Sequence, residues 1–216
     1  MSSYEEVPDV PREYLYEMES EAYEKKPKKK TINKFELFPK YTDTIKIFVN
    51  EKHKEIVCAV RGTADYRDMK ADLSALSGSV ENSKRYKEDK NFIEEIQKNY
   101  FPTSLYSWYA VGHSLGGMII DVLLKDKLIK SAVSYNPAVE YKYRHNKNHK
   151  RVYNEDDILY AGMGRYASNV EVRPNKTSLL SKLASLTKLG RLSRNINAHL
   201  LSNFVGGKLI HQFILN

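Results

Sequence analysis

The sequence Gly112-His113-Ser114-Leu115-Gly116 is the strongest indicator of the fold of this chain. An apolar run over 105–111 precedes it, which predicts a strand. Apolar side chains at helical spacing follow it and predict a helix: Leu115, Met118, Ile119, Val122 and Leu123. A serine between two glycines at such a junction is typical of a strained turn that presents the hydroxyl, although a plain tight connection has the same pattern. A side chain at Gly112 or Gly116 would push strand and helix apart.

Strand and helix patterns alternate on both sides of this turn. Two β-rich runs, 44–49 and 55–60, flank a polar turn and predict an antiparallel hairpin. Apolar positions in 86–100 recur at helical spacing, and short strands are predicted around 131–135 and 150–153. We therefore expect an α/β fold with a mainly parallel central sheet flanked by helices. In such sheets the ligand lies at the carboxyl ends of the strands.

The length of 216 residues, 41% of them hydrophobic, predicts one domain over 1–216. Its charged N-terminal segment, 1–40, is expected to pack on or beside the rest. Within that segment Leu15, Met18 and Ala22 predict a short amphipathic helix.

Features of the termini and of the single cysteine bear on location. No apolar run reaches the roughly 18 residues that span a membrane, and the N-terminus lacks the pattern of a secretory signal. Cys58 has no partner for an internal disulfide and lies in an apolar run, so it is expected in the core. These observations favour an intracellular protein.

The net charge of +8 favours contact with an anionic partner, either an acidic lipid surface or nucleic acid. Many of the 16 tyrosines fall inside apolar runs, where packing is the commoner role, so nucleic acid is disfavoured. Residues 178–196 form a leucine-rich, lysine-edged helical pattern. We expect this helix to pack on the sheet, while peripheral contact with an anionic membrane stays open.

A serine nucleophile needs a general base and an acid that orients it. The acid should follow a later strand, where Asp156 and Asp157 are both candidates. Downstream of them only His199 and His211 remain, and His199, at the head of an apolar stretch, is the better base.

The other histidines have weaker claims. His113 adjoins Ser114, so its side chain should point away from the hydroxyl. His145 and His149 share the basic segment 141–151, which we expect to be a solvated loop because it is rich in cations and lacks a third metal ligand. We expect neither a metal nor a cofactor.

Acyl transfer also needs hydrogen-bond donors for the developing oxyanion. The backbone N–H of Leu115, directly after the serine, is the first expected donor. The second should come from the glycine-containing turn after the strand that ends at Val60, where Thr63 offers an N–H and a hydroxyl.

Taken together, these motifs resemble the class 3 lipases, a family of the α/β-hydrolase fold. Arg61-Gly62-Thr63 followed by Asp72-Leu73 is similar to the family's oxyanion segment, and 112–117 match its serine turn. The segment 154–159 resembles its acid motif and aligns the acid with Asp157, while His199 fits its late histidine. The resemblance covers about residues 41–205.

This resemblance implies hydrolysis of a carboxylic ester, with a lipid ester such as an acylglycerol or phospholipid as substrate, through an acyl-enzyme on Ser114. Residues 64–85 leave little room for a long helical lid, so a small or absent lid is expected. Two alternatives stay open: a catalytically idle hydrolase-like fold that binds anionic membrane or nucleic acid, and transfer of the acyl group to an alcohol other than water.

Overall fold

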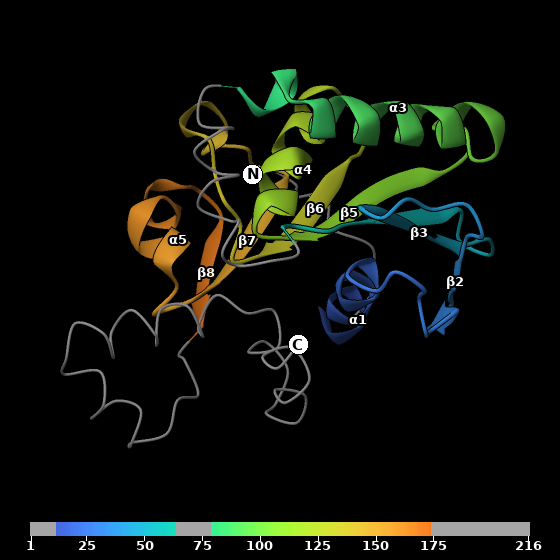
Figure 1. Ribbon diagram of the computed structural model, residues 1–216, viewed down its shortest axis with the longest axis horizontal. Coiled ribbons are helices and arrows are strands. Elements are labelled where there is room, and N and C mark those ends of the chain that lie inside the picture. Colours follow the sequence, from blue (N-terminus) through green and yellow to red (C-terminus); the bar gives the residue numbers. More distant parts are fainter. Residues whose placement is uncertain (1–11, 64–78, 174–216) are drawn as a thin grey trace.

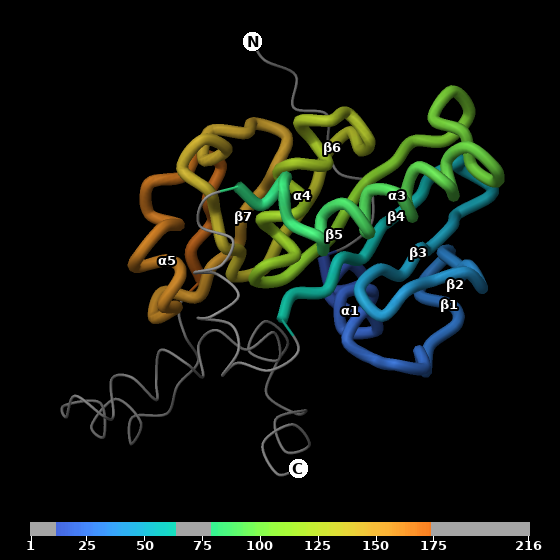
Figure 2. Tube along the Cα trace, turned by 45° about the horizontal axis from the view of Figure 1, so that its top comes forward, coloured from blue at the N-terminus to red at the C-terminus, as the bar shows by residue number. Residues whose placement is uncertain are grey.

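The computed structural model describes residues 12–63 and 79–173, which form an eight-stranded sheet in the order β1 to β8 (Figure 1). Each strand lies beside its predecessor in the sequence, so the colours of Figure 2 run in order across the molecule. The strands are β1 Thr31–Ile32, β2 Phe35–Leu37, β3 Ile45–Asn50, β4 Glu55–Val60, β5 Ser107–His113, β6 Ser131–Tyr135, β7 His149–Asn154 and β8 Val170–Arg173. Pairing is antiparallel from β1 to β4 and parallel from β4 to β8.

The helices cover both faces of this sheet. Helices α3 (Lys84–Asn99) and α4 (Leu115–Lys125) connect β4 to β5 and β5 to β6, and both lie on one face (Figure 1). Right-handed crossovers between strands that advance in one direction put their helices on the same side. The opposite face is covered by α1 (Arg12–Ala22), which packs against β3, β4 and β5. A short helix, α5 (Ile158–Gly162), follows β7, and single 3₁₀ turns lie at Val80–Asn82 (η1), Tyr141–Tyr143 (η2) and Gly164–Tyr166 (η3).

The period of two residues in the strands divides the core. In β4, Ile56 and Cys58 face the side of α3 and α4, whereas Val57 and Ala59 face α1. Both faces of the central strands are therefore apolar, as expected for a sheet buried between two layers.

Several sequence predictions are confirmed. The hairpin 44–49/55–60 is β3 and β4, Cys58 is fully buried, and the amphipathic helix of the N-terminal segment is α1, with Leu15, Met18 and Ala22 in the core. The strands β1, β2 and β8, of two to four residues, are additional to the prediction because they are too short to show an alternating pattern.

One prediction is wrong. The segment 141–151 is not a solvated loop throughout: His145 is exposed, but β7 begins at His149, and both His149 and Arg151 are fully buried. His149 begins the strand predicted around 150–153, and this end of the basic run is buried because His149 and Arg151 contact the Asp121 carboxylate.

Outside the described residues lie the expected helix 178–196, residues 64–78 of the segment 64–85 in which a lid was considered, and both His199 and His211. In the two described ranges, none of the helices combines the length and apolar character that a membrane crossing requires.

Candidate active site

Ser114 occupies a strained turn between β5 and α4. Its φ of 54° and ψ of −122° lie in a region that residues with side chains rarely adopt. Three backbone hydrogen bonds hold the turn. The Ser114 N–H donates to the Tyr135 carbonyl at 3.2 Å, and the Ser114 carbonyl accepts from the N–H groups of Gly117 and Ala138, each at 3.0 Å. The predicted strand–turn–helix geometry is confirmed.

The glycines around the serine have no room for a side chain. A Cβ on Gly116 would lie 1.9 Å from the Val60 carbonyl oxygen, and one on Gly112 would lie 2.6 Å from Ile120 Cδ1 and 3.2 Å from that same carbonyl. The start of α4 therefore presses directly on the end of β4, which is why these positions require glycine. A mainly parallel sheet with a strained serine between strand and helix is the arrangement of the α/β-hydrolase fold.

The Ser114 hydroxyl is buried and lacks a hydrogen-bond partner among the described residues. The residue is 2% exposed, and its Oγ makes no hydrogen bond within the described part of the chain. A buried hydroxyl without a partner is uncommon and calls for an explanation. The N–H of Leu115 begins α4 directly after it, where unpaired amides and the helix dipole favour negative charge.

The 61–63 loop, which follows β4, runs against the serine. A Cβ on Gly62 would lie 3.0 Å from Ser114 Cβ and 2.5 Å from the His113 carbonyl oxygen. Thr63, the second predicted oxyanion donor, is the next residue and is partly buried. The structure thus brings the loop of Thr63 beside the turn of Leu115.

His113 points away from the serine, as predicted. Its Nδ1 lies 2.7 Å from Tyr23 Oη, just beyond the end of α1, and the two rings meet edge to face. Tyr23 has no counterpart among the predicted site residues.

Asp157 lies at the carboxyl end of β7, at the N-cap of α5. Its carboxylate is fully buried, and Oδ1 accepts the N–H groups of Leu159 at 2.7 Å and Tyr160 at 3.1 Å. These amides fix the orientation of the carboxylate. Its neighbour Asp156 is partly exposed.

Ser114 and Asp157 follow two strands that are not direct neighbours in the sheet. The strands β5 and β7 are separated by one strand, so they lie about 10 Å apart. An imidazole that hydrogen-bonds through both ring nitrogens spans about 8 Å. The predicted base, His199, and its alternative His211 lie outside the described residues.

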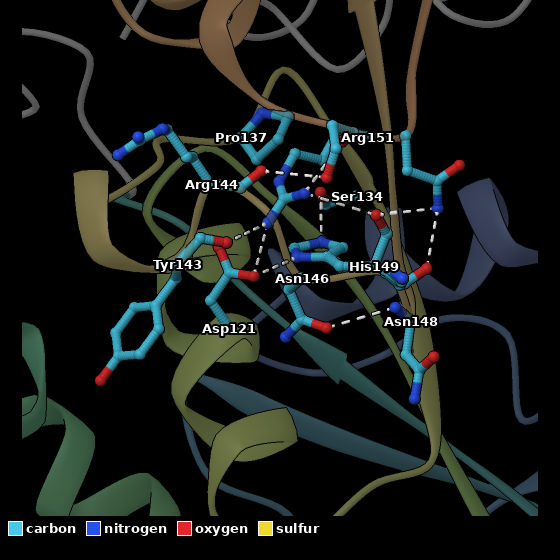
Figure 3. A network of polar contacts seen from close by, with 12 residues as sticks. Asp121, Ser134, Pro137, Tyr143, Arg144, Asn146, Asn148, His149 and Arg151 are labelled. Atoms are coloured by element: carbon cyan, nitrogen blue, oxygen red, sulfur yellow. Dashed lines mark hydrogen bonds and ion pairs between the residues drawn. The ribbon is translucent and has the colours of Figure 1, made fainter.

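A second serine takes part in a complete Ser–His–Asp chain on the α4 side of the sheet (Figure 3). Ser134 Oγ lies 2.7 Å from His149 Nε2, and His149 Nδ1 lies 2.8 Å from Asp121 Oδ1. Arg151 donates to that same Oδ1 at 2.6 Å and to the Tyr143 carbonyl at 3.1 Å. All four residues of this buried network, Ser134, His149, Asp121 and Arg151, are completely buried.

Burial sets the charge state of this network. Desolvation lowers the pKa of His149, and the Asp121 carboxylate opposes that effect while Arg151 adds to it. A buried neutral histidine thus links Ser134 to an aspartate that Arg151 neutralises. The sequence held one signal for it: Asp121 is the only acidic residue in the apolar helix 115–125, and a buried carboxylate requires cationic partners.

Comparisons with known proteins return lipases. No family model and no curated protein matches the chain. Similar solved structures include the Lip2 lipase from Yarrowia lipolytica, at 14% identity and a TM-score of 0.49 over 74% of this chain and 76% of that one. The mono- and diacylglycerol lipase from Aspergillus oryzae has 20% identity and a TM-score of 0.46, covering 76% and 77%. The lipase from Rhizopus microsporus var. chinensis has 16% identity and a TM-score of 0.43, covering 74% of each chain.

Within residues 12–63 and 79–173, no group of three or more His, Cys, Asp or Glu side chains is arranged to hold a metal ion.

Proposed function

We propose that this protein is a serine hydrolase that cleaves a carboxylic ester through an acyl-enzyme on Ser114. The observation that carries the proposal is the strained, buried Ser114, whose Oγ has no partner within the described residues. Such strain and such an unsatisfied hydroxyl both cost free energy, and both are explained if the hydroxyl is held ready for a substrate.

The reaction follows from the expected roles. Ser114 Oγ attacks the ester carbonyl carbon while His199 takes the hydroxyl proton, and Asp157 orients the imidazole and stabilises its positive charge. The carbonyl oxygen becomes an oxyanion that accepts from the N–H groups of Leu115 and Thr63. The tetrahedral intermediate expels the alcohol, which receives the proton from His199. Water, activated by the same histidine, then releases the acid and restores the serine.

A lipid ester is the proposed substrate class. The support is the resemblance of four ordered motifs to the class 3 lipases and the net charge of +8, which suits an anionic phospholipid surface.

Active-site labelling tests the nucleophile. The protein is treated with a fluorophosphonate and its intact mass measured, for wild type, Ser114→Ala and Ser134→Ala. We expect one adduct on wild type and Ser134→Ala and none on Ser114→Ala. Equal labelling of Ser114→Ala, or no labelling of wild type, would overturn the assignment, and the second result would favour an idle hydrolase-like fold.

A substrate series tests the class. Hydrolysis of p-nitrophenyl esters of rising chain length is compared with hydrolysis of acylglycerols and phospholipids, with Ser114→Ala as the blank. We expect longer chains and lipid esters to be preferred. Preference for acetyl over every longer chain would count against a lipid substrate.

A further inference from the structure

The 61–63 loop is held from both faces of the sheet. On the side of α3, Arg85 donates to the Arg61 carbonyl at 2.8 Å, and Asp89 fixes the Arg85 guanidinium. The Arg61 N–H donates to the Thr44 carbonyl at 2.9 Å, and the Thr44 hydroxyl donates to Asp89 at 2.6 Å. These contacts fix the beginning of the loop but not Gly62.

Gly62 is held from the side of α1. Its buried N–H donates to Tyr23 Oη at 3.0 Å, and that oxygen lies 2.7 Å from His113 Nδ1. One phenol therefore joins the residue before Thr63 to the residue before Ser114. The space between them is closely filled, since a Cβ on Gly62 would lie 2.8 Å from Tyr23 Oη.

The protonated phenol of Tyr23 can hydrogen-bond to both Gly62 and His113. Burial and the nearby Glu19 carboxylate raise the pKa of the Tyr23 phenol, so it keeps its proton at neutral pH. Its oxygen accepts from the Gly62 N–H, and its hydrogen bond with His113 Nδ1 runs in the direction that the histidine tautomer sets. Phenylalanine can make neither hydrogen bond.

We propose that Tyr23 is a positioning residue for the oxyanion hole: its phenol fixes the 61–63 loop against the serine turn and thereby sets the separation of the Thr63 and Leu115 donors. The inference rests on the proposed function. It assigns a role in the reaction to α1 and the turn after it, which lie outside the segments that carry the catalytic motifs.

The test compares an oxygen ester with its thionoester, in which sulfur replaces the carbonyl oxygen and accepts hydrogen bonds poorly. Tyr23→Phe keeps the ring and removes the oxygen. We expect kcat on p-nitrophenyl butyrate to fall roughly 10- to 100-fold with little change in KM, because the loss is in transition-state stabilisation. The rate on the thionoester should fall far less, so the ratio of the ester rate to the thionoester rate should decrease.

Tyr16→Phe is the matched control. Tyr16 is buried in α1, the helix that precedes Tyr23, and packs edge to face on Tyr135. Its ester-to-thionoester ratio should equal that of wild type. Amide exchange of Gly62, followed by NMR, gives a readout independent of activity: it should speed up at least tenfold in Tyr23→Phe and stay unchanged in Tyr16→Phe.

The outcomes separate the two proposals. If wild type hydrolyses the ester and Tyr23→Phe keeps the wild-type ratio, or loses both rates equally, the positioning role is overturned while the proposed function stands. If wild type hydrolyses neither substrate, the proposed function fails and this inference fails with it. Should Tyr23→Phe not fold, His113→Gln removes the His113 Nδ1 that contacts Tyr23 Oη. The same decrease in the ester-to-thionoester rate ratio is expected from this variant.

Discussion

Two neighbouring parallel strands, β5 and β6, have a serine near their carboxyl ends, and the surroundings of the two serines are opposite. Ser134, in β6, has an ordinary strand conformation, and its hydroxyl is satisfied by a histidine that is itself bonded to Asp121. Ser114, after β5, is strained and has no partner for its hydroxyl within the described residues. The site with the complete Ser–His–Asp hydrogen bonds is the less suited to catalysis.

The reason lies in what a transition state requires. A catalytic histidine must accept a proton, but burial and Arg151 both hold His149 neutral. No helix begins at Ser134, whereas α4 begins directly after Ser114, where the proposed function needs donors for an oxyanion. The buried network joins α4 to β6 and β7, and this contrast supports the proposal that Ser114 is the nucleophile.

The largest expected effect is at the proposed acid. Asp157→Asn should lower kcat by about 10⁴-fold, because an amide no longer stabilises the imidazolium or selects its tautomer. Asparagine caps helices as well as aspartate does, so the fold should be kept. Ester hydrolysis and far-UV circular dichroism check this, with Asp156→Asn as the control that retains activity. A reversed pattern would move the acid to Asp156.

Breaking the buried network should lower the free energy of unfolding rather than the rate of ester hydrolysis. Arg151→Met leaves Asp121 charged, buried and without its cation, which should lower the free energy of unfolding by about 3–5 kcal/mol. Adding Asp121→Asn should recover part of that loss. Urea unfolding measures both, and Lys84→Met, which breaks only an exposed ion pair with Glu88, should cost less than about 1 kcal/mol. Equal losses from Arg151→Met and Lys84→Met would contradict this account.

The turn itself can be tested with one methyl group. Gly116→Ala places a Cβ against the Val60 carbonyl, so α4 must shift, at a cost of about 1–3 kcal/mol and with displacement of Ser114. Gly162→Ala meets no atom within 4 Å and should be neutral or slightly stabilising. Thermal unfolding and fluorophosphonate labelling distinguish the two variants. Wild-type stability and labelling in Gly116→Ala would show that the contact is not tight.

The smallest expected effect is on pH dependence. Because the folded pKa of His149 lies below its ordinary value near 6.5, the unfolded chain takes up the proton first. The stability due to neutral His149 is present above about pH 6.5 and is lost as the pH falls from there toward the folded pKa, with a slope of at most about 1.4 kcal/mol per pH unit.

The contribution of His149 is isolated by comparing the pH dependence of Tm in wild type and in His149→Gln. We expect the fall in Tm between pH 7.5 and 5.5 to be smaller in His149→Gln than in wild type. His145→Gln, at an exposed position of the same segment, should follow wild type. The comparison is needed because buried Glu19 acts in the opposite direction: desolvation raises its pKa, so its contribution to stability grows as the pH falls. An identical pH profile for wild type and His149→Gln would exclude His149 as the titrating group.

The parts of the fold that were predictable are local. The hairpin, α3, β5 and the serine turn each follow from periodicity and glycine placement within about 20 residues, because sterics and alternation act along the chain. The placement of Asp157 at a strand end was also predictable, but its burial beside the partly exposed Asp156 was not.

The serine turn and the alternation of strands and helices around it are therefore written in local sequence, since Gly112, Ser114 and Gly116 encode that geometry within a few residues. The partners of the buried polar groups depend instead on the folded arrangement of distant segments. In the sequence His149 and Arg151 are two members of a basic run, and β7 brings them to Asp121, about 30 positions earlier in the chain. Tyr23 reaches Gly62 across 39 positions and His113 across 90. Such contacts depend on how the layers pack, and no local pattern specifies them.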